Sequence, residues 1–134
     1  MRDLSQEAKA VDPGESAPRG RLERWVDGYV VAWTDNDPEH IAALFTEDAV
    51  YDPQTADGEI HGVEAISDWW RGLDEDPANW DFQWLPLIET EEIGIITGTT
   101  NYYDPPTTFR NLWVIRFDDD GRCRDFTEWY IEEE

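Results

Sequence analysis

The chain has 134 residues, of which 32 are acidic and 10 are basic, so its formal net charge is −22. A surface this acidic repels phosphate backbones and anionic lipid headgroups, which excludes nucleic acids and membrane surfaces as expected partners. The length favours one domain, and a hydrophobic fraction of 40% with eight tryptophans excludes a disordered chain.

The first 18 residues carry mixed charges and proline-containing turns but no apolar periodicity. We therefore expect a flexible N-terminal arm over residues 1–18 and one folded domain over residues 19–134. The arm lacks the apolar stretch of a secretory signal, no segment reaches the length of a membrane span, and Cys123 is the only cysteine. These features predict a soluble, cytoplasmic protein without an internal disulfide.

Three helices are predicted in the first part of the domain. The first has the apolar spacing of one helix face and ends near Asn36. Asp37 and Pro38 supply the cap and the first position of a second, shorter helix. A short strand at residues 49–51 and a brief one at residues 59–61 precede a third helix over residues 63–71, whose inward face includes Trp69.

After residue 79 the apolar pattern changes to period two, because Trp80, Phe82 and Trp84 alternate with polar residues. Four strands are predicted, over residues 80–89, 93–103, 108–118 and 122–132. Hairpin-sized turns join them, so the second half should be an antiparallel meander. Helices followed by a meander predict the α+β class.

Three stretches of the chain resemble the nuclear transport factor 2-like superfamily, which includes the SnoaL-like polyketide cyclases and the steroid Δ-isomerases. They are VVAWTDNDPEHIAALFTEDAVYDP, IHGVEAISDWW and LWVIRFDDDGRCRDFTEWYIEE. The resemblance implies a cone-shaped half-barrel, in which a curved antiparallel sheet wraps around the N-terminal helices. It also implies a pocket between the first helix and the concave face, and a homodimer through the convex sheet face. The same fold hosts enzymes and non-catalytic binding domains, so it leaves the function open.

Two candidate catalytic residues follow from this resemblance. Asp52 matches the general base of the isomerases, and burial in an apolar pocket would raise the pKa of its carboxyl toward neutrality. The alternative is that Asp52 only starts the turn at Pro53. Tyr29 matches the tyrosine that stabilises the dienolate oxygen, and its alternative is a core tyrosine bonded to backbone. Trp113 stands where the isomerases have a second acid, so steroid isomerase activity is not expected.

Strand alternation adds further candidates. If Trp113 faces the pocket, so does Asn111. The resemblance places Glu128 and Tyr130 inward on the last strand, with Glu128 as another catalytic acid. A slip of one residue would instead expose Glu128 and bury Trp129.

The remaining expected ligand-binding residues are Trp33, Trp69 and His61, although a lone histidine such as His61 more often has a structural role. The two histidines lack the spacing of a zinc site, and no cofactor is expected. One hypothesis is a cofactor-independent isomerase, cyclase or hydratase acting on a small hydrophobic molecule. The alternatives are a non-catalytic binding or sensing domain for such a molecule, and a dimeric interaction domain.

Overall fold

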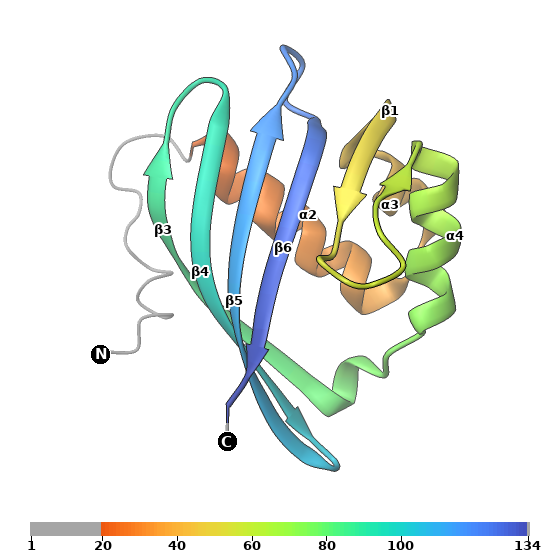
Figure 1. Cartoon of the computed structure of the whole chain (residues 1–134), viewed down its shortest axis with the longest axis vertical. Helices are drawn as coiled ribbons and strands as arrows, with labels where there is room; N and C mark the ends of the chain where they lie inside the picture. Colours follow the sequence, from red (N-terminus) through yellow and green to blue (C-terminus); the bar gives the residue numbers. More distant parts are fainter. Residues whose placement is uncertain (1–19, 134) are drawn as a thin grey trace.

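The computed structural model of the chain describes residues 20–133, and the predicted arm at residues 1–18 lies outside this range. Helices come first and long strands follow, which confirms the predicted α+β class (Figure 1). The helices are α2 (Arg21–Asp35), α3 (Pro38–Ala42), α4 (Val63–Leu73) and the short 3₁₀ helix η2 (Pro77–Asn79). The strands are β1 (Phe45–Asp52), β2 (Ile60–His61), β3 (Trp80–Glu89), β4 (Ile93–Tyr103), β5 (Pro106–Phe117) and β6 (Cys123–Glu132).

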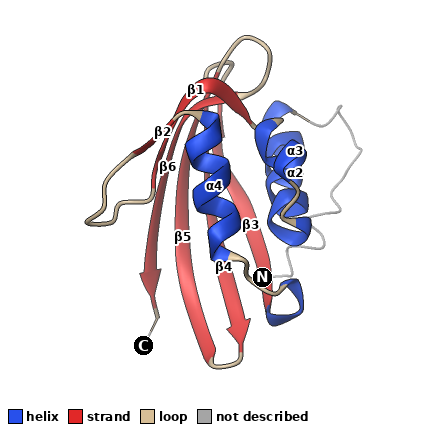
Figure 2. Ribbon diagram, turned by 90° about the vertical axis from the view of Figure 1, so that its right-hand side faces the viewer, coloured by secondary structure: helices blue, strands red, loops and turns tan. Residues whose placement is uncertain are grey.

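The described strands form one curved, six-stranded sheet in the order β2-β1-β6-β5-β4-β3, and the helices gather on one side of it (Figure 2). Strands β3 to β6 pair antiparallel, as predicted. Strand β1 pairs with β6 in parallel, so the expectation of an entirely antiparallel sheet is wrong at this pair. Alternation determines which side chains share a face, whereas the direction of a distant strand depends on how the chain returns across the helices.

Helix α2 has its predicted apolar face and its predicted end. Its buried residues are Leu22, Trp25, Val26, Tyr29 and Ala32. Asn36 adopts the left-handed conformation at its C-terminus, and the Asn36 N–H donates to the carbonyl of Ala32 at 2.8 Å. The Asp37 carboxylate then accepts the Glu39 N–H at 2.9 Å and caps α3, with Pro38 in its first turn.

Aromatic packing fixes α2 across the centre of the sheet. The Trp25 ring lies 5.5 Å from the ring of Phe126 on β6, and the Tyr29 ring lies 4.4 Å from that of Trp113 on β5. Such ring pairs add specific geometry to the burial of a large apolar area. They therefore hold Tyr29 in one position above the inner face of the sheet.

The register of β5 and β6 decides which polar groups face the helices. Asn111, Trp113, Ile115 and Phe117 are buried, which confirms the predicted alternation on β5. Trp113 pairs with Glu128, and Asn111 pairs with Tyr130. Cross-strand partners share a face, so Glu128 and Tyr130 point inward. Trp129 is 48% exposed, so the slipped register is wrong.

None of the helices in the described part of the chain is long and apolar enough to cross a membrane.

Candidate functional site

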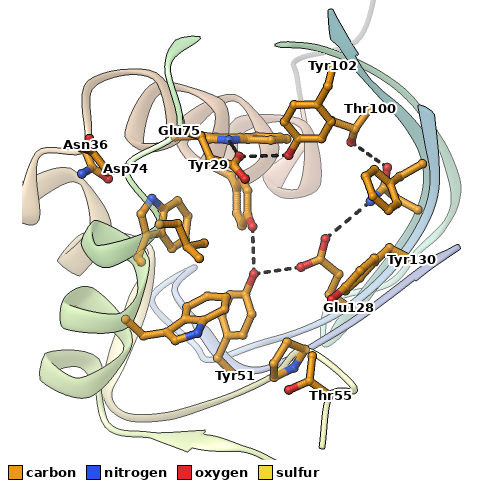
Figure 3. Close-up of a pocket in the computed structure, with 17 residues that line it drawn as sticks. Tyr29, Asn36, Tyr51, Thr55, Asp74, Glu75, Thr100, Tyr102, Glu128 and Tyr130 are labelled. Carbon is orange, nitrogen blue, oxygen red and sulfur yellow. Dashed lines mark hydrogen bonds between the residues drawn. The ribbon is translucent and has the colours of Figure 1, made fainter. Parts of the chain in front are cut away.

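A cavity of about 310 Å³ opens between α2, α4 and the inner face of the sheet (Figure 3). The predicted hollow between the first helix and the sheet is therefore present. Eight aromatic side chains line it: Tyr29, Trp33, Tyr51, Trp69, Trp70, Tyr102, Phe109 and Tyr130. The charged residues of the lining are all acidic: Asp74, Glu75 and Glu128. An apolar cavity with a few convergent polar groups is the usual form of a small-molecule site.

The Glu128 carboxylate lies inside this cavity and accepts three hydrogen bonds. The Tyr51 hydroxyl donates to Oε1 at 3.0 Å. The Trp113 Nε1–H and the Asn111 amide donate to Oε2 at 3.3 Å and 3.5 Å. No lysine, arginine or histidine lines the cavity, so only neutral donors solvate this carboxylate among the described residues.

Burial in the aromatic cavity raises the pKa of Glu128 to about 7. The hydrogen bonds from Tyr51, Trp113 and Asn111 favour the ionised form and hold the pKa down, while the charge of Glu75 pushes it up. Both protonation states of Glu128 are therefore populated near neutral pH. That is the condition under which a carboxyl can both take and return a proton.

Tyr29, Tyr51 and Glu128 form a continuous hydrogen-bonded chain, drawn in Figure 3. The two hydroxyl oxygens are 2.9 Å apart. Ionised Glu128 can only accept, so Tyr51 donates to it and receives the hydrogen of Tyr29. If a proton resides on Oε1 of Glu128, the chain can reverse, and the Tyr29 hydrogen becomes available to a ligand. The protonation state of Glu128 thus sets the donor capacity of Tyr29.

Tyr29 and Tyr51, the two tyrosines of this hydrogen-bonded chain, stay protonated at physiological pH. Burial, followed by the charge of Glu128, raises the pKa of Tyr29 and of Tyr51 well above the ordinary value for a phenol. Their hydroxyls can therefore relay hydrogen bonds without ionising themselves.

A second layer of contacts orients the donors to Glu128. The Thr100 hydroxyl donates to Oδ1 of Asn111 at 2.8 Å, which turns the amide nitrogen of Asn111 toward Glu128. The Trp113 ring stacks on Phe82 with centroids 4.9 Å apart. Neither donor can rotate away without losing these contacts.

Glu75, in the loop between α4 and η2, is a second carboxylate in the cavity. Its Oε1 accepts the Trp33 indole N–H and the Tyr102 hydroxyl, each at 3.0 Å. Glu75 was not predicted as a site residue, because it lies in an acidic loop segment that is typical of solvent-exposed chain. No local pattern marks it, since only the return of α4 toward the sheet brings it to the cavity.

Most of the residues predicted from the sequence meet at this cavity. Six are part of its lining: Tyr29, Trp33, Trp69, Asn111, Glu128 and Tyr130. Trp113 is 1% exposed and lies behind the residues that line the cavity. Its indole N–H donates to Glu128, which is one of those lining residues.

Asp52 lies outside the cavity, so its expected placement there is wrong. Alternation along β1 buries Ala49 and Tyr51 on the inner side and turns Asp52 away. The Asp52 carboxylate accepts the backbone N–H of Gln54 at 3.0 Å and starts the turn, which was the alternative interpretation. Tyr51, one residue earlier, occupies the inward position, and the Ala49–Tyr51 alternation was the signal that could have identified it.

The expected contribution of His61 to the cavity is also wrong. Its side chain is 67% exposed, and Nε2 lies 3.1 Å from a carboxylate oxygen of Glu59. Ile60, the preceding residue of the two-residue strand β2, packs against the core instead. Alternation then directs His61 to solvent.

A group of metal-ligating side chains lies away from the cavity, at the junction of α2 and α3. The ligand atoms of Asp35, Asp37 and His40 lie within 4.8 Å of one another. Asp37 already caps α3, and the His40 ring nitrogen is 2.6 Å from Asp35. These contacts account for the cluster as a helix-terminus arrangement.

The family model of the SnoaL-like domain matches residues 22–126. A protein of unknown function with a cystatin-like fold from Methylobium petroleophilum PM1 has 20% identity and a TM-score of 0.70, and the match covers 87% of this chain and 80% of that chain. An NTF-2 like protein of unknown function from Burkholderia xenovorans LB400 has 13% identity and a TM-score of 0.68, covering 85% of each chain. A steroid delta-isomerase from Pseudomonas aeruginosa has 18% identity and a TM-score of 0.62, covering 84% of this chain and 81% of that one. No curated protein matches the sequence. At these identities the structural matches establish the NTF2-like fold alone.

Proposed function

The chain belongs to the SnoaL-like domain family, and from that premise we propose that it binds a small, largely apolar molecule and transfers a proton on it with Glu128, without a cofactor. Tyr29 and Tyr51 would take part in that transfer. The aromatic lining would supply most of the binding free energy, because apolar burial is its dominant source for such ligands.

The environment of Glu128 is the observation that carries this proposal. A carboxyl whose pKa is raised to about 7 by burial is matched to proton transfer at neutral pH. Three neutral donors hold it in one orientation toward the cavity. A carboxylate with a purely structural role is normally paired with a cation, and none lines this cavity.

A carbonyl compound is the substrate type that uses both Glu128 and the tyrosines. Ionised Glu128 would take a proton from the carbon next to the carbonyl. The electrons of that C–H bond would form a carbon–carbon double bond, leaving the negative charge on the carbonyl oxygen. A proton on Oε1 allows the chain through Tyr51 to reverse, so that Tyr29 donates to that oxygen as it becomes negative. Where the substrate carries a further conjugating double bond, return of the proton to its far carbon gives an isomer. Attack of the enolate on a second carbonyl closes a ring instead, and the new alkoxide takes the proton from Glu128.

Non-catalytic binding or sensing of a similar molecule is the second candidate function. One observation favours it. While Glu128 is ionised, the hydroxyl hydrogen of Tyr29 bonds to Tyr51 and that of Tyr51 bonds to Glu128. In that state neither of these two hydroxyls offers a hydrogen to a ligand.

Base-catalysed ring opening of nitrobenzisoxazole tests the first candidate without knowledge of the substrate. A base removes the proton on carbon, the N–O bond breaks, and a coloured cyanophenolate forms. We expect a rate above background that rises with pH to half its maximum near 7, following the ionisation of Glu128. In Glu128→Gln the rate above background should fall at least about tenfold.

Asp52→Asn is the matched control, because it removes one negative charge beside the site and keeps the acceptor for Gln54. It should leave the rate unchanged. The catalytic proposal fails if Glu128→Gln retains the rate or if the inflection lies at the ordinary carboxyl pKa. Binding of the probe, seen as quenched tryptophan fluorescence, with no turnover would favour the second candidate.

A further inference from the structure

The charged groups of the cavity are of one sign. Its acids are Asp74, Glu75 and Glu128, and no basic side chain lines it. Two of these acids, Glu75 and Glu128, are close enough for the charge of one to raise the pKa of the other. Like charges that face one cavity without a counter-ion are unfavourable unless a bound cation neutralises them.

We propose that the cavity selects a ligand bearing a protonated amine on an aromatic or other apolar body, with Glu75 as the group that binds the ammonium. This inference rests on the proposed function, because it assigns a chemical class to the molecule bound in the same cavity. It also gives Glu75 a specificity-determining role distinct from the acid–base role of Glu128.

The hydrogen bonding of Glu75 leaves room for such a ligand. Trp33 and Tyr102 both donate to the same oxygen, Oε1. Within residues 20–133, the other oxygen of Glu75 is left to accept from a bound molecule. The two neutral donors orient the carboxylate but do not neutralise it, so its charge remains available to an ammonium group.

The aromatic rings suit the same chemistry. Eight of them line the cavity, and ring faces attract cations such as ammonium groups. The Trp33 ring is held by stacking on Trp80, with centroids 3.8 Å apart, and by its N–H bond to Glu75. A rigid indole beside a fixed carboxylate is a preorganised site for a cation, and preorganisation reduces the entropy lost on binding.

The charge of the whole molecule favours the same class. At a net charge of −22, the protein attracts cations and repels anions before they reach the cavity. Anionic substrates such as carboxylic acids or phosphate esters would meet both this field and the three cavity acids. They are therefore the least suitable class.

Binding of an ammonium ion should also promote ionisation of Glu128. The titratable groups that line the cavity with Glu128 are Tyr29 of α2, Tyr51 of β1, Asp74 and Glu75 of the α4–η2 loop, Tyr102 of β4 and Tyr130 of β6. Glu75 is the acid among them whose charge raises the pKa of Glu128, and the tyrosines are phenols. A cation beside Glu75 would offset the charge of Glu75, which adds to the rise that burial causes in the pKa of Glu128.

Three probes with one ring system and different charges test the inference. They are tryptamine, tryptophol and indoleacetate, whose side chains end in an ammonium, a hydroxyl and a carboxylate. Calorimetric titration of the full chain near neutral pH should show tryptamine binding at least about tenfold more tightly than tryptophol, and indoleacetate most weakly. In Glu75→Gln, which can still accept from Trp33 and Tyr102, tryptamine should weaken about tenfold while tryptophol stays within about twofold.

Asp52→Asn again serves as the control for loss of one charge outside the cavity, and it should alter neither affinity by more than about twofold. The inference is overturned if tryptophol binds as tightly as tryptamine, or if Glu75→Gln weakens both probes equally. In either case the rate difference between wild type and Glu128→Gln still decides the proposed function separately. Failure of all three probes to bind would instead count against the pocket as a binding site, and so against both proposals.

Discussion

At the residue scale, the properties of the site depend on one carboxyl group surrounded by neutral donors. The Glu128 carboxylate accepts hydrogen bonds from Tyr51, Trp113 and Asn111. Each of these donors is held in place by further packing or hydrogen bonding. Burial favours the protonated form of Glu128 more than the donors favour the ionised form, because the pKa rises to about 7. The balance between these two effects can be measured in the stability of the protein as well as in its activity.

The raised pKa of Glu128 predicts a specific loss of stability with pH. The folded pKa, about 7, lies above the ordinary value of 4.5, so the folded state holds this proton more tightly than the unfolded chain does. The contribution of Glu128 to the free energy of unfolding should be fully present below about pH 4.5 and fall as pH rises to about 7. The fall is at most about 3 kcal/mol, reduced where water in the cavity screens the charge.

Glu128→Gln should remove this part of the pH dependence, since glutamine does not titrate. Urea unfolding at about pH 5 and about pH 8 should show wild type losing more free energy of unfolding than the variant by up to about 3 kcal/mol. Comparing the two proteins cancels the titration of the other acids, which they share. Parallel pH dependences would show that Glu128 titrates normally in the folded protein.

The hydrogen-bonded chain predicts different effects for its two tyrosines. Tyr51 donates directly to Glu128, whereas Tyr29 reaches it only through Tyr51. Tyr51→Phe removes a bond that favours the ionised carboxylate, so the pKa of Glu128 should rise further. Tyr29→Phe keeps that bond and should change the pKa of Glu128 less. Carbon NMR of labelled Glu128 across the pH range would measure its pKa in both variants. Equal changes in that pKa would contradict the hydrogen-bonded chain from Tyr29 through Tyr51 to Glu128.

At the element scale, close approaches of side chains to β4 position the donors of the site. A Cβ added to Gly98 would lie 2.7 Å from the Phe82 ring, which stacks on Trp113. Gly98 thus allows Phe82 to lie flat against the sheet and to hold the indole that donates to Glu128. The lack of a side chain at this position is a packing requirement, since Gly98 is not among the residues with positive φ.

Two glycine-to-alanine substitutions should therefore change stability in opposite directions. Gly98→Ala should destabilise the protein by about 1–3 kcal/mol because Phe82 must move. Gly72→Ala, near the end of α4, meets nothing within 4 Å and should stabilise it by up to about 1 kcal/mol through helix propensity. Urea unfolding of the two variants measures both effects. A tolerated Gly98→Ala would show that Phe82 can repack without cost.

At the scale of the whole molecule, the outer face of the sheet carries a row of apolar side chains. Leu85 pairs with Thr97, Thr97 with Leu112, and Leu112 with Trp129, so these residues cross strands β3 to β6 in register. Leu85 is 43% exposed, Leu112 36% and Trp129 48%. We propose that a second copy of the chain covers this face, as the family resemblance implies.

This proposal predicts a dimer that strengthens with salt, because two copies with a net charge of −22 repel each other until the charges are screened. Light scattering coupled to gel filtration at about 0.05 M and about 0.5 M salt would measure it. Trp129→Glu should give a monomer at both concentrations. Val31→Glu, an equally exposed apolar position on α2, should leave association unchanged. A wild-type monomer at high salt would contradict the proposal.

The sequence by itself determined the elements and the faces they bury. The α2 face with Tyr29, the cap at Asp37, and the alternation that puts Asn111 and Trp113 on one face of β5 follow from periodicity and local chemistry. These are properties of neighbouring residues, so a linear pattern can encode them. The inward direction of Glu128 was implied only by the family resemblance, because the alternation on the last strand allowed two registers.

Only the tertiary structure decided which side chains meet. It showed that β1 runs parallel to β6, that Tyr51 rather than Asp52 faces the cavity, and that the loop residue Glu75 joins Glu128 there. The pKa of Glu128 also depends on the tertiary structure, because it is set by burial in the cavity and by the charge of Glu75, 53 positions away in the chain. Such effects act through space between segments far apart in sequence, and no local pattern records them.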